Sequence, residues 1–362
     1  MGYVAIKGGQ AAIEEANRLV DYHRVKSGRY LDVETIKAGL KPLVDQVMSE
    51  SSLYDEDLAA LAIKQAEGSP EEAVFLLRAH RSTLPRMYYS ETVDTRNMRV
   101  MRRISASFKD ILGGQILGKS QDFRHRFLDF DLVNETDATV AKTIASFLDL
   151  APEPEPLALT AIPKVIDYLA QQGLYHYPPL DDATPDDITK KSLSFPSSRS
   201  QRLQSLTRGQ SGAVISLGYA ELRGFGISNH PNIGELRVGM IPLEVQGLGR
   251  EEPYYFGEIE VTEVECFVAK EVKDEQQQVT KTFDIGYGIT FGHNETKTIA
   301  MSILDYSLEQ NDKAHPTSNP EFVLLSIDSV ESTGFISHLK LPHYVTFQSL
   351  LDGIRSIKEK KV

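Results

Sequence analysis

The chain has 362 residues, of which 41% are hydrophobic and 25% are charged, and this composition is typical of a globular protein. Its length exceeds the size at which one hydrophobic core usually stops growing, so we expect two domains. The net charge of −12 disfavours nucleic-acid binding, and no stretch reaches the ~20 apolar residues of a membrane span, so we expect neither kind of partner.

The first 150 residues are expected to form a mostly helical domain with a short β segment. Residues Tyr3 to Ile6 read as an extended piece. Apolar residues at helical spacing then predict helices over residues 11–26, 33–48, 55–66 and 69–82. Asp55 and Ser69 are placed to cap the last two of these helices, and the alternating pattern between Phe123 and Leu132 predicts a strand.

A proline-rich linker is expected over residues 151–185, because prolines remove backbone donors and stiffen the chain. Residues 186–362 are expected to form an α+β domain. Strands are predicted over residues 213–220, 259–268 and 283–291, and helices over 294–308, 321–330 (stopped at Gly334) and 346–360. The predicted fold class is α/β with mixed α+β character: a helical N-terminal region, then a mixed β-sheet domain with flanking helices.

A single cysteine, Cys266, cannot form an internal disulfide, and the start MGYVAIKGGQ lacks the layout of a signal peptide. We therefore expect a cytoplasmic protein. One thiolate also cannot hold an iron–sulfur cluster, so any radical chemistry based on such a cluster would belong to another chain.

The segment from Gly113 to Ser120 matches the phosphate-loop pattern, with Lys119 in the place of the phosphate-binding lysine. A phosphate loop opens a helix, whereas the residues that follow here are predicted to form a strand. A phosphate-loop kinase or ATPase is therefore disfavoured, and Lys119→Ala is expected to change activity little.

Arginines that cluster in an acidic chain indicate an anionic ligand, because guanidinium groups match phosphate oxygens. The candidates for phosphate binding are Arg102, Arg103, Arg199 and Arg202, together with His293, where a helix start would offer free amides to an anion. The alternative is a solvated face with scattered ion pairs. The glycines of GYGITFG, from Gly286 to Gly292, are interpreted as tight turns between strands.

Two histidines in SHLKLPHYV, His338 and His343, have a spacing common among zinc ligands. Two ligands do not complete a site, so a third must come from elsewhere; the alternative is a pair of ordinary loop histidines. Among the carboxylates, Glu235 is the candidate for acid–base work. The glutamates at 258, 260, 263 and 265 could form an acid pair, but an exposed strand face explains most of them.

Eight ordered blocks resemble the I subunit of the carbon–phosphorus lyase core complex, which serves bacterial phosphonate use. They include YVAIKGG, RRISASFKDILGGQILG, HRFLDF, SRSQRLQSLTRG, NHPNIGELRVG, GYGITFGHNETK and SHLKLPHYVTFQ, and cover nearly the whole chain apart from about residues 134–182. This resemblance implies a complex that displaces adenine from ATP by a phosphonate to give ribose 1-phosphonate 5-triphosphate.

The same resemblance implies that this subunit performs the nucleosidase-type step, with ATP, accompanied by magnesium, and an alkylphosphonate as substrates. It also implies that His338 and His343 hold zinc at the boundary with the radical iron–sulfur subunit, one of several partner subunits. The alternative function is a non-catalytic scaffold that contributes metal ligands to a partner's active site.

Overall fold

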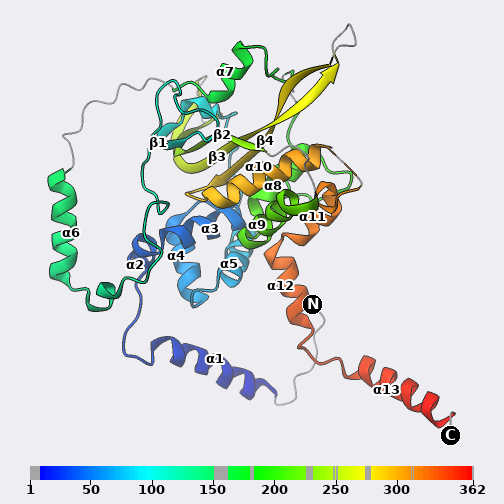
Figure 1. The fold of residues 1–362 in the computed structure, drawn as a ribbon. Coiled ribbons are helices and arrows are strands. Elements are labelled where there is room, and N and C mark those ends of the chain that lie inside the picture. The colour runs from blue at the N-terminus through cyan, green and yellow to red at the C-terminus, as the bar shows by residue number, and fades with distance from the viewer. Residues whose placement is uncertain are drawn as a thin grey trace.

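The structure is a computed structural model that describes residues 9–150, 162–179, 183–225, 231–247, 249, 252–273, 279–310, 312 and 314–360. The predicted extended piece at residues 3–6 lies outside these ranges, and so do residues 151–161 and 180–182 of the predicted proline-rich linker. In the part of the chain that is described, no helix is both long and apolar enough to cross a membrane. Figure 1 shows helices packed beneath a twisted sheet, with several helices reaching away from this body.

The N-terminal region is helical, as predicted. It comprises α1 (Gly9–Val25), α2 (Val33–Gly39), α3 (Lys41–Ser51), α4 (Glu56–Gln65) and α5 (Pro70–Thr83). The side chains of Asp55 and Ser69 accept backbone amides at the starts of α4 and α5, which confirms both caps. The single helix predicted over residues 33–48 is wrong, because the chain breaks at Leu40, two residues before Pro42.

One antiparallel sheet crosses the molecule in the order β1-β2-β3-β4. Its strands are β1 (Arg99–Ile104), β2 (Asn232–Val245), β3 (Tyr254–Lys273) and β4 (Val279–Phe291). The predicted strands at 259–268 and 283–291 are confirmed, and so is the mixed α/β fold class. Because β1 pairs with β2, the sheet contains strands from both expected domains. The division at residues 151–185 stays a prediction.

Helix α10 (Glu295–Gln310) covers one face of the sheet, against β3 and β4 (Figure 1). A Cβ atom at Gly286 or Gly288 would lie 1.9 or 2.4 Å from the carbonyl oxygens of Ser302 and Thr298. These glycines therefore let α10 approach the sheet, and our interpretation of them as turn residues is wrong.

Helices α8 (Arg199–Arg208) and α9 (Ser211–Ala220) follow, and α9 ends in a π-helical turn at Glu221–Phe225. The strand predicted over residues 213–220 is wrong: Val214 and Gly218 pack α9 against α10, where a Cβ on Gly218 would meet Ala300 at 2.9 Å. A short apolar run without clear periodicity does not distinguish a strand from a buried helix.

The C-terminal region contains α11 (Pro320–Ser326), α12 (Ser329–His338) and α13 (Tyr344–Glu359). The prediction of one helix over residues 321–330, stopped at Gly334, is wrong, because Asp328 caps a new helix that continues through Gly334. The tail helix is confirmed. Figure 1 shows α12 and α13 leading away from the body as a C-terminal arm, residues 329–360.

The other face of the sheet is covered by α7 (Val165–Gln171) and by short turns such as Thr95–Asn97. The strand predicted between Phe123 and Leu132 is wrong, since this segment is a loop followed by a 3-10 turn at Phe130–Asn134. Its aromatic side chains are exposed, and the free edge of β1 is bridged by Ile116 instead. Helix α6 (Asp137–Leu150) follows.

Candidate functional site

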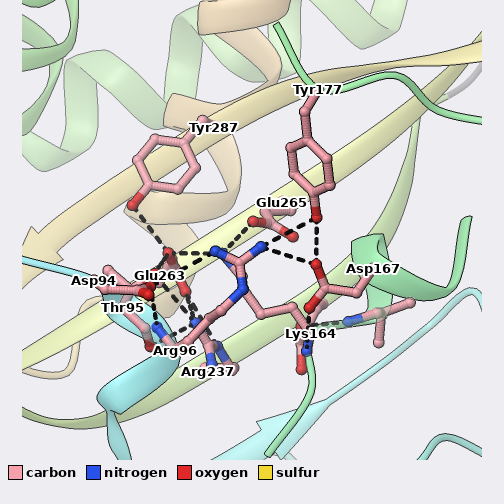
Figure 2. Close-up of polar contacts among 12 residues, drawn as sticks. Asp94, Thr95, Arg96, Lys164, Asp167, Tyr177, Arg237, Glu263, Glu265 and Tyr287 are labelled. Atoms are coloured by element: carbon pink, nitrogen blue, oxygen red, sulfur yellow. Dashed lines mark hydrogen bonds and ion pairs between the residues drawn. The ribbon is translucent and has the colours of Figure 1, made fainter. Parts of the chain in front are cut away.

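A cluster of buried charges lies on the α7 face of the sheet (Figure 2). Glu263 and Glu265 of β3 are only 2% and 5% exposed, so the prediction of an exposed acidic face is wrong for these two residues. Glu263 accepts hydrogen bonds from four side chains: Thr95 Oγ1 at 2.7 Å, Tyr287 Oη at 3.0 Å, Lys164 Nζ at 3.1 Å and Arg237 Nε at 3.1 Å.

The two glutamates differ in protonation. Burial alone would raise the pKa of Glu263, but Arg237 and Lys164 outweigh it and lower this pKa to about 2. Burial raises the pKa of Glu265 to about 7, and the ion pair with Lys164 opposes this only in part. One carboxylate is thus held ionised while its neighbour can keep a proton near neutral pH.

Beside this cluster, the predicted catalytic residue Glu235 is bonded to the predicted phosphate ligand Arg103, and both are almost completely buried. Arg103 also donates to the carbonyl oxygens of Leu112 at 2.6 Å and Pro163 at 2.7 Å. Glu235 accepts the amide of Val165 at 3.0 Å. Both side chains are therefore occupied by contacts that join β1, β2 and α7, and they present no free group to a substrate.

A second region, which we call the α10 cleft, encloses about 860 Å³ at the start of α10. It is lined by Lys41, Pro42, Asp45, residues 118–122, Arg124, Arg126, Glu260, His293, Glu295 and Thr296. Two predicted site residues meet here. Glu295 accepts from Arg102 Nε and lies 2.9 Å from His293 Nε2, and Arg102 Nη2 also reaches Asp122 at 2.7 Å.

The loop over residues 118–126 supplies cations to the α10 cleft. Within the described ranges, the side chains of Lys119, Arg124 and Arg126 form no hydrogen bond or ion pair, so three positive charges line the cleft without a directly bonded carboxylate. Neither a strand nor a helix follows Lys119, so the disfavoured phosphate loop is absent. The predicted phosphate ligands did not include Arg124 and Arg126, although the basic run RHR at residues 124–126 was the available signal.

The helix start at His293 does not offer free amides, contrary to our prediction. The amide of His293 donates to Asp45 Oδ2 at 3.2 Å, and that of Asn294 donates to Thr262 Oγ1 at 3.0 Å. Asp45 already occupies the position of an anion, and a Cβ on Gly292 would lie 2.4 Å from its carboxyl carbon. Burial raises the pKa of Asp45, although Lys41 opposes this rise.

Arg199 and Arg202 do not join the α10 cleft. Arg199 Nη2 lies 2.7 Å from Asp305 Oδ2, and Arg202 pairs with Glu309, both on α10. Asp305 is ten residues beyond Glu295, which is about 15 Å along a helix. These two candidate phosphate ligands therefore lie apart from Arg102, and the pair fastens α8 to α10.

His338 and His343 lie side by side in the C-terminal arm, with ring centroids 5.4 Å apart. Each Nδ1 faces a backbone carbonyl oxygen, that of Phe335 or of Leu341, so each Nε2 is available to a metal. Among the described residues, no group of three or more metal-binding side chains forms a complete site. A metal would therefore need ligands from outside this part of the chain.

Comparison with known proteins places these features in a family. Residues 2–361 match the model of a family described as bacterial phosphonate metabolism protein (PhnI). The putative C-P lyase subunit protein HtxH of Stutzerimonas stutzeri is 42% identical over 368 residues, covering 99% of this chain and 97% of that protein.

Two further relatives carry the name alpha-D-ribose 1-methylphosphonate 5-triphosphate synthase subunit PhnI. The protein of Escherichia coli (strain K12) is 40% identical over 365 residues, covering 99% of each chain. That of Rhizobium meliloti (strain 1021) is 40% identical over 372 residues, covering 99% of this chain and 95% of the relative.

Proposed function

The chain belongs to the PhnI family of bacterial phosphonate metabolism proteins, and we propose that it is the subunit of a phosphonate-degrading complex in which a phosphonate displaces adenine from ATP. In this reaction the bond between C1′ of the ribose and N9 of adenine breaks. A bond between C1′ and a phosphonate oxygen forms, and adenine leaves with a proton. The products are ribose 1-phosphonate 5-triphosphate and adenine.

The observation that carries the proposal is a set of three cations in the α10 cleft that form no ion pair with any described residue. A triphosphate needs several converging positive charges, and Lys119, Arg124 and Arg126 provide them from one loop. The cleft is large enough for a nucleotide at about 860 Å³. Magnesium would enter with the triphosphate. Glu260 and Asp122 also line the cleft, and they would offer this ion the carboxylate oxygens that it prefers.

His293 and Glu295 are suited to the step at the anomeric carbon. Burial would raise the pKa of Glu295, but hydrogen bonds from His293 and Arg102 outweigh it and lower this pKa, so the carboxylate is ionised. Its negative charge can stabilise the developing oxocarbenium ion. A protonated imidazole can donate a proton, so His293 is our candidate donor to the departing adenine.

We further propose that zinc binds His338 and His343, with the missing ligand supplied by a partner subunit that carries an iron–sulfur cluster. The free Nε2 atoms in the exposed arm support this assignment. Cys266 is buried, and burial raises its pKa to about 11, so this thiol is unsuited to hold a cluster itself.

The test is an assay of adenine release from ATP plus methylphosphonate, with the partner subunits present. Arg124→Gln combined with Arg126→Gln should raise the KM for ATP by about tenfold or more, because each charge-assisted contact is worth about 1.5–3 kcal/mol. Arg99→Gln is the matched control, since Arg99 forms a surface pair with Glu258 outside the cleft. Equal KM values for the double variant and the control would refute the triphosphate site.

The alternative function is a scaffold that lends metal ligands to a partner. It is favoured by α1 and α13, which bury no residue and expose apolar side chains such as Leu19 and Phe347. Adenine release by the isolated chain would support the catalytic assignment. If activity requires partners and survives His293→Ala and Glu295→Gln, the scaffold function is the better description.

A further inference from the structure

A separate cavity of about 220 Å³, which we call the α12 cavity, lies at the root of the C-terminal arm. Its walls come from residues 188–193, from α8 and from the junction between α11 and α12. None of its lining residues belongs to the α10 cleft. It therefore cannot be an extension of the proposed nucleotide site.

Arg208, the last residue of α8, contributes a positive charge to this cavity, and it forms no ion pair with any described residue. Its Nε is buried without a hydrogen-bond partner, and Nη1 donates to the carbonyl oxygen of Ile188 at a long 3.4 Å. Burial, together with Arg78 and Arg81, lowers the pKa of Arg208 to about 10, and the nearby carboxylates oppose this only in part. Ser192 and Ser205 also line the cavity and add hydroxyl donors.

Carboxylates from the α12 side face the cavity. Asp328 is engaged by Arg78 Nη1 at 2.6 and 2.9 Å and also caps α12, so its charge is compensated. Glu331, in the first turn of α12, is exposed and has no ion pair with any described residue. Among its described lining residues, the cavity thus carries one cation without an ion pair on the α8 side, Arg208, and one such anion on the α12 side, Glu331.

We propose that the α12 cavity binds a small zwitterion, with the oxyanion held by Arg208, Ser192 and Ser205 and an ammonium group held by Glu331. A simple oxyanion would be repelled by Glu331, and a simple amine would be repelled by Arg208. A ligand with both charges separated by a short spacer complements both. A cavity of about 220 Å³ has room for several water molecules, so a zwitterion of a few heavy atoms fits in it.

Two classes of zwitterion share this chemistry, aminoalkylphosphonates and short amino acids. Either would bridge α8 to the first turn of α12. Because α12 ends at His338, the ligand would strengthen the attachment of the arm that carries the histidine pair. The bound ligand therefore links the body of the subunit to its proposed metal site.

The experiment is calorimetric titration of the full-length chain with 2-aminoethylphosphonate, β-alanine, methylphosphonate and ethylamine. The two zwitterions should bind at one site. Methylphosphonate and ethylamine each lack one of the two charged groups, so each loses one charge-assisted interaction and should bind about tenfold or more weakly. The ratio between 2-aminoethylphosphonate and β-alanine decides which oxyanion is preferred.

Variants test the contributions of the Arg208 and Glu331 charges separately. Glu331→Gln should weaken binding of 2-aminoethylphosphonate but strengthen binding of methylphosphonate, whereas Arg208→Gln should weaken both. Arg202→Gln is the control on the same helix, because Arg202 pairs with Glu309 outside the cavity. Unfolding curves establish that each variant is folded.

Three results would overturn the proposal. The first is equal affinity for methylphosphonate and 2-aminoethylphosphonate. The second is weaker methylphosphonate binding in Glu331→Gln. The third is binding that survives Arg208→Gln but is lost in Arg124→Gln, which would place the ligand in the α10 cleft. Adenine release is not needed for any of these readouts, so the zwitterion site and the proposed activity can fail independently.

Discussion

Arg102 and Arg103 are neighbours on β1, yet their guanidinium groups lie on opposite faces of the sheet. Arg102 bonds to Glu295 at the start of α10, whereas Arg103 bonds to Glu235 on β2. This follows from the alternation of side chains along a strand. The two arginines therefore serve different regions, one beside the α10 cleft and the other beside the buried cluster around Glu263.

Removing one partner of the Arg103–Glu235 pair should destabilise the fold. Arg103→Gln leaves the buried carboxylate of Glu235 without its counter-ion, and such a loss typically costs about 3–5 kcal/mol. Denaturant unfolding measures this change. Arg99→Gln, which breaks a surface pair with Glu258, should cost no more than about 1 kcal/mol. Similar costs for both variants would contradict the assignment of a buried structural role.

Lys119→Ala should weaken ATP binding without a matching loss of kcat. The side chain lines the α10 cleft and forms no ion pair with a described carboxylate, so it is free to bind the triphosphate. Because the triphosphate itself does not react at C1′, we expect this contact to be equally strong in the ground and transition states. This replaces our expectation of little change. Steady-state kinetics of adenine release test it, and a fall in kcat with unchanged KM would show that Lys119 acts on the reacting centre instead.

Glu265 should make stability depend on pH. Because its pKa rises from 4.5 to about 7 on folding, the native state binds more protons than the unfolded state within this window. Its contribution to the free energy of unfolding is therefore largest below pH 4.5 and is lost as the pH rises to about 7. Glu265→Gln should gain stability relative to the wild type as the pH rises, measured by denaturation at pH 5 and pH 8.

Lys297 gives the opposite dependence. Burial lowers its pKa to about 8, and its Nζ donates to the carbonyl oxygen of Thr207 at 2.7 Å. The unfolded state binds more protons between about pH 8 and 10.5, so stability should rise across that window. Lys297→Met should be more stable than the wild type at pH 7, by about 1–3 kcal/mol. A less stable variant would show that the bond to Thr207 outweighs the burial of charge.

His338→Ala should lower the zinc content of the assembled complex without unfolding the subunit. The side chain is half-buried, and its hydrogen-bond and ring contacts with described residues lie within its own arm, so the fold does not depend on it. Elemental analysis of the purified complex measures the metal. His80→Ala, a change on the exposed end of α5, is the control. Unchanged zinc in His338→Ala would count against the site.

Local signals in the sequence predicted several elements well. The caps Asp55 and Ser69, and the strands 259–268 and 283–291, follow from capping chemistry and alternation, which neighbouring residues decide. Three predictions failed where partners far along the chain decide the outcome. Residues 213–220 are a helix because α10 covers them. The free edge of β1 is bridged by Ile116 rather than by residues 123–132, and the glycines of β4 admit α10.

The candidate site depended even more on distant contacts. The sequence alone singled out Arg102 and His293, which lie close together beside the α10 cleft, and the two histidines near the C-terminus, which lie side by side. Side-chain chemistry is a local property, so such residues can be listed from the sequence, but their roles as anion or metal ligands stay predictions. It could not show that Arg103 neutralises Glu235, that Asp45 occupies the helix start at His293, or that Arg124 faces the same cleft. These relations depend on burial and charge pairing between residues widely separated in sequence, and only the tertiary structure determines them.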